Sequence, residues 1–170
     1  MEEKVIRELS SIVGESWVVT EMDKMRDYLI DETPELIRPK PNINSILIKP
    51  ANPEEIAEIL KYANRNLIPV IPRGGGTGLC AAVTSPEQSI ILSLERLNKI
   101  LEIDMDNLMV TCEAGVTLGA LIEYLDRAVK TLSFPIHPGS EVAQIGGMIA
   151  TKAGGVRAVR YGAMRNYVEG

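Results

Sequence analysis

The hydrophobic positions at the start of the chain recur at the spacing of an amphipathic helix. Between Glu2 and Val13 they lie on one side of a helical period, and Gly14 follows where a glycine commonly ends a helix. The positions are Val5, Ile6, Leu9, Ile12 and Val13. The following stretch, 20–41, is charged and interrupted by prolines, so only a short helix around 22–29 is predicted there.

Strand and helix patterns then alternate along the chain. Ser45–Lys49 is an apolar run typical of a buried strand. Asn52-Pro53-Glu54-Glu55 supplies the cap, the first-turn proline and the acidic residues of a helix start. Leu67–Ile71 has the pattern of a second strand. We therefore predict a βαβ unit over Ser45–Ile71.

The second half of the chain is predicted to hold short strands and one clear helix. Residues 89–94, 99–104 and 108–113 are strand-like and separated by turn residues, which indicates an antiparallel meander. Thr117 caps a helix with apolar residues at helical spacing. The predicted fold class is α+β, with a small βαβ lobe at about 1–80 and a mixed-sheet lobe at about 81–170.

The composition is that of an ordinary globular chain. Its 170 residues suit one domain, or one domain of two small lobes. A net charge of −5 argues against nucleic acid or an anionic membrane as a partner. Cys80 and Cys112 have no metal-binding spacing and are expected to be reduced thiols. Because neither a membrane-spanning apolar run nor a signal-peptide pattern is present, we expect a cytoplasmic protein.

Candidate chemistry begins where the second predicted strand ends. Ile71–Leu79 reads IPRGGGTGL and places four glycines at the edge of a parallel sheet where ligands bind. The run lacks the last glycine and the following helix of a Rossmann motif, and it lacks the Gly-Lys-Ser/Thr of a Walker loop. Backbone N–H groups and the cation of Arg73 suit a diphosphate. A purely structural glycine turn and a surface ion pair for Arg73 are the alternatives.

A second glycine-rich stretch lies further along the chain. Pro138–Met148 reads PGSEVAQIGGM. Two such loops in one small chain indicate a long, bent, phosphate-bearing ligand held between them, which we interpret as FAD.

Several segments occur in the order seen in one known family. They are Pro72–Gly78, Leu92–Ile100, Val110–Val116, Pro138–Gly147, Ala153–Gly155 and Tyr161–Gly162. On these segments, the chain from Ile46 to Gly170 resembles the FAD-binding domain of the vanillyl-alcohol-oxidase and PCMH type. The resemblance is greatest to the branch of D-lactate dehydrogenase and the glycolate oxidase subunit GlcD, and it implies two lobes with the cofactor between them.

The resemblance also implies which residues contact the cofactor. The residues facing the FAD pyrophosphate would be Arg73, Gly74, Gly75, Gly76, Thr77 and Gly78, with Leu79 close by. The residues near the ribityl chain and flavin would be Pro138, Gly139, Ser140, Ala143, Gln144, Gly146 and Gly147.

Several positions depart from the family pattern or invite a separate assignment. Thr77 stands where members that bind FAD covalently have His, so a dissociable FAD is expected. Lys152 stands where the family usually has Asn, which removes one hydrogen bond expected at the flavin. His137 is the only histidine, and we expect it to be a partly exposed loop residue rather than a proton-transfer group. The arginines near the C-terminus, Arg157, Arg160 and Arg165, are expected to be solvated or paired.

The implied activity is that of a flavin-dependent oxidoreductase. It would transfer a hydride from C2 of a small 2-hydroxy acid, such as lactate or glycolate, to the flavin N5. Family members continue past Tyr161–Gly162 and then add a substrate-binding cap domain. We therefore expect an incomplete second lobe, no cap, no catalytic residue in this chain, and a split subunit, truncated product or engineered fragment.

Two alternatives to that activity are open. One is a non-catalytic FAD-binding module or remnant that needs a complementary chain, and the other is a flavin reductase of the MurB type. An incomplete lobe would expose strand edges, which also predicts self-association.

Overall fold

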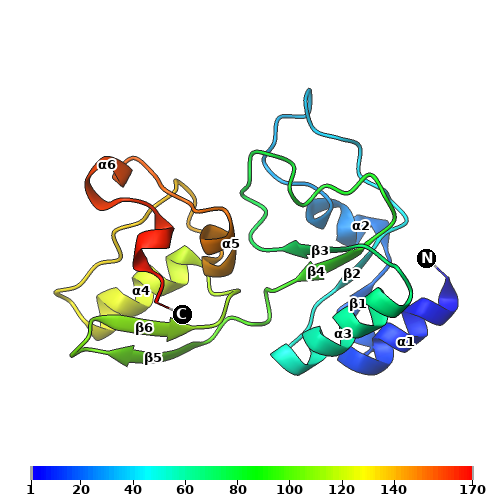
Figure 1. Ribbon diagram of the computed structural model, residues 1–170, viewed down its shortest axis with the longest axis horizontal. Helices are drawn as coiled ribbons and strands as arrows, with labels where there is room; N and C mark the ends of the chain where they lie inside the picture. Colours follow the sequence, from blue (N-terminus) through cyan, green and yellow to red (C-terminus); the bar gives the residue numbers. More distant parts are fainter. Residues whose placement is uncertain (1, 170) are drawn as a thin grey trace. The chain divides into compact units, whose positions relative to one another are not determined.

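The computed structural model describes residues 2–169, which form two compact units, Met1–Arg96 and Leu97–Gly170 (Figure 1). The division lies after Arg96, later than the boundary near residue 80 expected from the sequence. No helix of the described residues has the length and apolar character needed to cross a bilayer. Cys80 and Cys112 are both free.

The first unit is built on a four-stranded mixed sheet. Its strands are β1 (Val18–Val19), β2 (Ile46–Ile48), β3 (Val70–Arg73) and β4 (Ile90–Ser93), in the spatial order β1-β2-β4-β3. Only β1 is antiparallel to its neighbour; β2 and β3 both run parallel to β4. The predicted βαβ unit is therefore confirmed, with β4 inserted between its two strands.

The position of β4 corrects the predicted meander of 89–94 with the two strands that follow. Ile90, Ile91, Leu92 and Ser93 are all buried, so β4 is covered on both faces. A continuous buried apolar run is the pattern of a central parallel strand, whereas a strand with one solvated face alternates. The mixed sheet of the α+β fold accordingly lies in the first unit, and a separate antiparallel sheet lies in the second.

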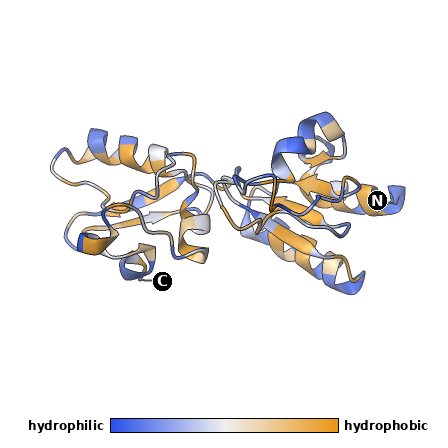
Figure 2. Ribbon diagram, turned by 90° about the horizontal axis from the view of Figure 1, so that it is seen from above, coloured by the Kyte–Doolittle hydropathy of each residue, from blue (hydrophilic) through white to orange (hydrophobic). Residues whose placement is uncertain are grey.

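Helices cover both faces of this sheet. Helices α1 (Glu3–Val13) and α3 (Pro53–Arg65) pack on one face through a shared core, as Figure 1 shows. The short helix α2 (Met22–Met25) and the 3-10 turn η2 (Arg26–Tyr28) pack on the other face, where Met25 and Leu29 contact Leu47 and Ile91. Figure 2 shows strongly hydrophobic strands between helices that are hydrophobic on one side only. The predicted helices at the N-terminus and around 22–29 are thereby confirmed.

Helix α3 begins and ends with specific capping interactions. The Asn52 side chain accepts a hydrogen bond from the Glu55 N–H at 2.8 Å, and the Glu55 carboxylate accepts one from the Ala51 N–H at 2.7 Å. At the other end Leu67 has a φ of 54°, and the Ile68 N–H reaches the Ala63 carbonyl at 2.9 Å. This is a Schellman arrangement, which normally places glycine at the left-handed position.

The second unit packs helices on a two-stranded antiparallel sheet. Strands β5 (Ile100–Asp104) and β6 (Met109–Cys112) pair with each other. Helix α4 (Leu118–Ala128) is capped by Thr117, whose hydroxyl accepts from the Ala120 N–H, as predicted. The core joins α4 to residues of the later chain, and its members include Leu121, Leu125, Ile136, Ile145, Met148 and Met164.

The glycine-rich end of the chain contains short helices that the sequence pattern did not predict. They are α5 (Ile145–Ala150), α6 (Ala158–Tyr161) and the 3-10 helix η3 (Met164–Tyr167). Helix α5 also ends in a Schellman arrangement, since Lys152 has a φ of 53° and the Ala153 N–H donates to the Met148 carbonyl at 2.8 Å. Asn tolerates this backbone conformation better than Lys does, which gives a backbone reason for the Asn that the resemblance implies at this position.

A polar network lies where the parallel strands of the first unit end. The Lys49 ammonium donates to the Glu95 carboxylate at 2.7 Å and to the Tyr28 hydroxyl at 2.8 Å. The Tyr28 and Ser93 hydroxyls both donate to the other Glu95 oxygen, at 2.8 Å and 3.0 Å. Burial alone would raise the pKa of Glu95, but the bonds from Lys49, Tyr28 and Ser93 outweigh it and hold that pKa below its ordinary value of 4.5.

The left-handed Leu67 predicts a stabilising substitution. Leu67 is 89% exposed, so Leu67→Gly loses little packing and relieves the left-handed strain. We expect a gain of about 0.5–1 kcal/mol in the free energy of unfolding of the first unit. Urea unfolding followed by the fluorescence of Trp17, the only tryptophan, measures it. Leu67→Ala is the control and should gain nothing; an equal gain for both variants would show that the backbone conformation is not the cause.

The lowered pKa of Glu95 predicts a pH-dependent stability contribution. A carboxyl group whose pKa is depressed by folding stabilises the protein above its unfolded pKa, and this contribution is lost as pH falls through the folded pKa. Glu95→Gln should therefore cost about 1 kcal/mol at pH 7, allowing for partial exposure, and progressively less below about pH 4.5. Trp17-detected urea unfolding at both pH values tests this, with the exposed Glu102→Gln as control. A Glu95→Gln cost that is the same at pH 7 and pH 3 would contradict the network's role.

Candidate functional site

The first glycine loop follows β3 at the carboxyl edge of the parallel sheet. All three parallel strands lead into polar residues at this edge: β2 into Lys49, β3 into the glycine loop through Arg73, and β4 into Glu95. The carboxyl ends of parallel strands are the usual location of ligand sites in such sheets. The sequence prediction of a loop leaving the strand at this edge is confirmed by the position of β3.

Arg73 lies partly buried inside the first loop. Its guanidinium donates to the Gly74 carbonyl at 2.9 Å and to the Asp27 carbonyl at 2.8 Å, and it lies 4.7 Å from the centre of the Tyr28 ring. Its Nε is buried without a hydrogen-bond partner. Within residues 2–169, no carboxylate forms an ion pair with Arg73, so the surface ion pair weighed as an alternative is not found.

Burial governs the electrostatics of Arg73. It lowers the pKa of the guanidinium, and the nearby Tyr28, Glu95, Asp27 and Asp31 offset this only in part. Because an arginine in a protein stays protonated, the lowered pKa expresses a cost of burying charge rather than a loss of charge. An anion placed at this loop would compensate that cost.

The glycines of the first loop have different roles. Gly76 has a φ of 74°, and a Cβ there would collide with the Arg73 guanidinium. A Cβ on Gly78 would lie 3.2 Å from a carboxylate oxygen of Asp31. Gly74, Gly75 and Thr77 are half-buried, while the side chain of Leu79 is 63% exposed. The backbone therefore closes around the guanidinium, and Leu79 projects outward.

Residues around Asp31 and Thr33, far before the loop in the sequence, pack against it. This contact was not predicted from the sequence. Asp31 is 6% exposed, and one of its carboxylate oxygens accepts from the Thr33 N–H at 3.1 Å while the other has no partner. The Thr33 hydroxyl accepts from the Ala81 N–H at 2.6 Å, just beyond the loop. The segment carries no functional motif, so only the folded structure shows that it lies at the site.

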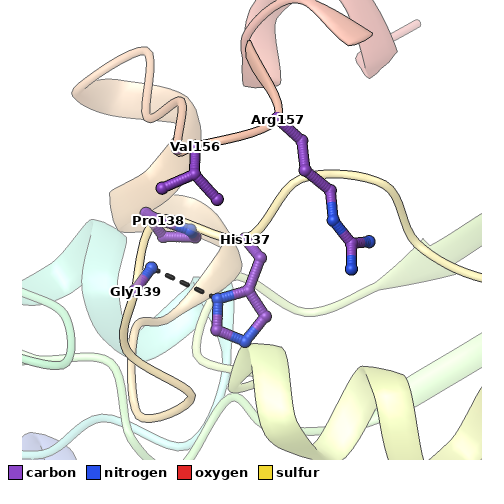
Figure 3. Close-up of a pocket in the computed structure, with 6 residues that line it drawn as sticks. His137, Pro138, Gly139, Val156 and Arg157 are labelled. Atoms are coloured by element: carbon purple, nitrogen blue, oxygen red, sulfur yellow. Dashed lines mark hydrogen bonds between the residues drawn. The ribbon is translucent and has the colours of Figure 1, made fainter. Parts of the chain in front are cut away.

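The second loop borders an open pocket in the second unit. The pocket has a volume of about 670 Å³, and its lining residues are His137, Pro138, Gly139, Gly155, Val156 and Arg157 (Figure 3). Gly139 has a φ of 107° with free space where a Cβ would lie, and its N–H donates to Nδ1 of His137 at 3.2 Å. Gly155 is needed because a Cβ there would fall on the His137 carbonyl oxygen.

The other residues predicted in the second loop divide into buried and open positions. Ala143 is 4% exposed and belongs to the core, and Gln144 is 7% exposed with its Oε1 buried and without a partner. Gly146 packs on Ala114, because its N–H donates to the Ala114 carbonyl at 2.8 Å and a Cβ would lie 2.8 Å from the Ala114 side chain. A Cβ on Gly147 would meet no atom within 4 Å. Of the two adjacent glycines, Gly147 is the one with room for a ligand.

His137 is the titratable residue at the second loop that the sequence singled out. Its side chain is 36% exposed, as expected of a partly exposed loop residue. Its Nε2 lies 3.9 Å from a carboxylate oxygen of Glu141, which is four positions further along the loop and was not taken into account in the sequence analysis. Arg157 borders the same pocket and a smaller one of about 270 Å³, and Figure 3 shows its side chain extending away from Pro138 and Val156.

Several characterised and solved proteins are similar to this chain. A D-lactate dehydrogenase of Archaeoglobus fulgidus is 52% identical over 141 residues, 83% of this chain and 31% of that protein. The glycolate oxidase subunit GlcD of Bacillus subtilis is 35% identical over 144 residues, 84% of this chain and 29% of that protein. The chain thus spans about a third of the length of these curated relatives.

The solved structure of p-cresol methylhydroxylase with substrate bound shares the fold, with a TM-score of 0.75 and 23% identity over 89% of this chain and 29% of that one. The family model for the FAD binding domain matches residues 45–170. It covers both glycine loops and all elements from β2 onward. The chain therefore belongs to the FAD-binding domain family of PCMH type, together with D-lactate dehydrogenase and glycolate oxidase subunit GlcD.

Proposed function

We propose that this chain holds FAD without a covalent bond, with the diphosphate at the first glycine loop and the flavin side of the cofactor at the second. The observation that carries this proposal is the Arg73 guanidinium, partly buried beneath the loop with no carboxylate bonded to it. The identity of the cofactor, FAD, follows from the family to which the chain belongs. The assignment of individual contacts is the proposal.

The first loop has the donors that a diphosphate requires. Gly74, Gly75, Gly76, Thr77 and Gly78 all carry backbone N–H groups, and no side chain larger than Thr77 intervenes. Hydrogen bonds to a charged group contribute about 1.5–3 kcal/mol each, so a few of them and one cation can support micromolar binding after the cost of association. The acidic character of the whole chain does not oppose this, because the cation is local.

The second loop suits the less charged parts of the cofactor. Pro138 and Gly139 border the open pocket, and Gly147 leaves room for a flat group against the backbone. The unpartnered Oε1 of Gln144 is an acceptor that a small local movement would bring to an N–H or O–H donor of the ligand. Thr77 at the position of the linking His of covalent members supports a dissociable cofactor.

The substrate class follows from the relatives. Two of the relatives are named D-lactate dehydrogenase and glycolate oxidase subunit GlcD. Lactate and glycolate, the compounds in these names, are both 2-hydroxy acids. We propose that the complete assembly oxidises a small 2-hydroxy acid, for which bound flavin supplies the hydride acceptor. This chain supplies the cofactor-holding part. The catalytic base and the substrate-binding groups are proposed to come from a cap domain or a complementary chain.

Visible spectroscopy with a charge variant tests the cofactor proposal. Purified chain titrated with FAD should develop the structured flavin band of a bound cofactor. Arg73→Met should weaken binding about 10–100-fold, because the unpaired cation at the loop is lost. Arg7→Met on the exposed face of α1 is the control and should bind like the original chain. A chain whose spectrum and fluorescence do not respond to FAD would overturn the proposal.

Anaerobic reduction tests the placement of catalysis. We expect the FAD-loaded chain to stay oxidised when D-lactate or glycolate is added, because the catalytic base and the substrate-binding groups are proposed to lie outside this chain. Photoreduction in the same cuvette confirms that the bound flavin accepts electrons. Bleaching by either acid would show that the chain carries its own catalytic groups, and His137→Gln would then identify whether His137 is one of them.

A further inference from the structure

The segment Asp27–Thr33 contacts the first glycine loop at its beginning and near its end, and also contacts the chain just beyond the loop. We name this segment the strap. The Asp27 carbonyl accepts from the Arg73 guanidinium where the loop begins. The Asp31 carboxylate lies against Gly78 near the end of the loop, and the Thr33 hydroxyl accepts from the Ala81 N–H just beyond it.

We propose that the strap is a positioning element of the diphosphate site, in which Tyr28 fixes the guanidinium of Arg73 and Thr33 fixes the exit of the glycine loop. This inference rests on the proposed function of the loop and deepens it. It assigns a ligand-binding role to a segment outside residues 45–170, the range that the family model covers.

Tyr28 is held so that it can orient Arg73. Its hydroxyl donates to Glu95 at 2.8 Å and accepts from Lys49 at 2.8 Å, so the side chain cannot move away from Arg73 without breaking these hydrogen bonds. The guanidinium of Arg73 lies 4.7 Å from the ring centre and the Lys49 ammonium 4.5 Å.

The network also sets which cation is available to a ligand. Glu95 pairs with Lys49 at 2.7 Å, which leaves Arg73 as the cation without a carboxylate partner in this cluster. A ring that attracts the guanidinium without neutralising it places a charge under the loop and leaves that charge for an anion.

Thr33 holds the loop's exit in an unusual conformation. Ala81 has a φ of 54°, a left-handed conformation that a residue with a Cβ adopts at a cost. Such a conformation persists when surrounding contacts determine it. The 2.6 Å bond from the Ala81 N–H to Thr33, which is 4% exposed, is one such contact. The strap itself is anchored by Arg38, whose guanidinium donates to the Asp31 and Thr33 carbonyls.

The test compares matched pairs of variants by FAD titration, followed by flavin fluorescence. Tyr28→Leu removes the ring and should weaken FAD binding about tenfold, whereas Tyr28→Phe keeps the ring and should stay within about twofold. Thr33→Val removes the acceptor in nearly the same volume and should weaken binding about fivefold, whereas Thr33→Ser should restore it. Tyr124→Leu on α4, in the second unit, is the control and should change nothing.

Two further measurements separate positioning from general destabilisation. If Tyr28 acts through Arg73, adding Tyr28→Leu to Arg73→Met should weaken binding by less than about twofold more. The dependence of the dissociation constant on NaCl concentration should also become weaker in Tyr28→Leu, because the cation is no longer held at the ligand. Trp17 fluorescence in urea confirms that each variant is folded during the titration.

The outcomes are distinguishable. An original chain that does not bind FAD overturns the proposed function and with it this inference. If the original chain binds FAD but folded Tyr28→Leu and Thr33→Val bind it equally well, the strap proposal falls and the proposed function stands. Additive losses in the Tyr28–Arg73 pair would also overturn positioning through Arg73. If Tyr28→Leu does not fold, the comparison of Thr33→Val with Thr33→Ser decides the proposal.

Discussion

The candidate site depends on one partly buried cation that forms no salt bridge with any carboxylate of the described residues. Burying the guanidinium of Arg73 carries a desolvation cost. Carboxylates that lie near it without bonding to it offset only part of this cost. The groups that contact the guanidinium directly are neutral: two backbone carbonyls and an aromatic ring. Neutral groups hold the position of the cation without cancelling its charge. A site of this kind is prepared for an anion before the anion arrives.

The carboxyl edge of the sheet explains how an acidic chain can build such a site. Three parallel strands place Lys49, Arg73 and Glu95 at one edge of the sheet, and of these three side chains Lys49 and Glu95 pair with each other. Glu95 is bound by Lys49, Tyr28 and Ser93, so it is satisfied without Arg73. The net charge of −5 describes the surface as a whole and says little about this edge. Local pairing decides which charge a ligand meets.

Much of the fold was predictable from the sequence because it is encoded locally. The helix beginning at Pro53 has its cap, proline and acidic residues within a few positions. Both glycine loops can be recognised from their high glycine content. The placement of β4 was not predicted, because strand order depends on which faces become buried and not on neighbours in the sequence. The roles of Ala143, Gln144 and Gly146 could not be separated either. Their burial is set by the core of the second unit and by Ala114.

The strap illustrates the strongest limit on reading a site from sequence. Tyr28, Asp31 and Thr33 contribute a ring, a carboxylate and a hydroxyl, and in the sequence each is a common polar residue type with nothing to mark it as part of a site. Their partners Arg73, Gly78 and Ala81 lie more than forty positions further along the chain. The hydrogen-bonded pairs Asp27–Arg73 and Thr33–Ala81 are separated by 46 and 48 positions. A glycine loop can be recognised by itself because glycine is unusual, but what holds it in shape is built from common residues. The conformation of such a loop is therefore a property of the first unit as a whole, and the left-handed Ala81 is where that dependence is visible in the backbone.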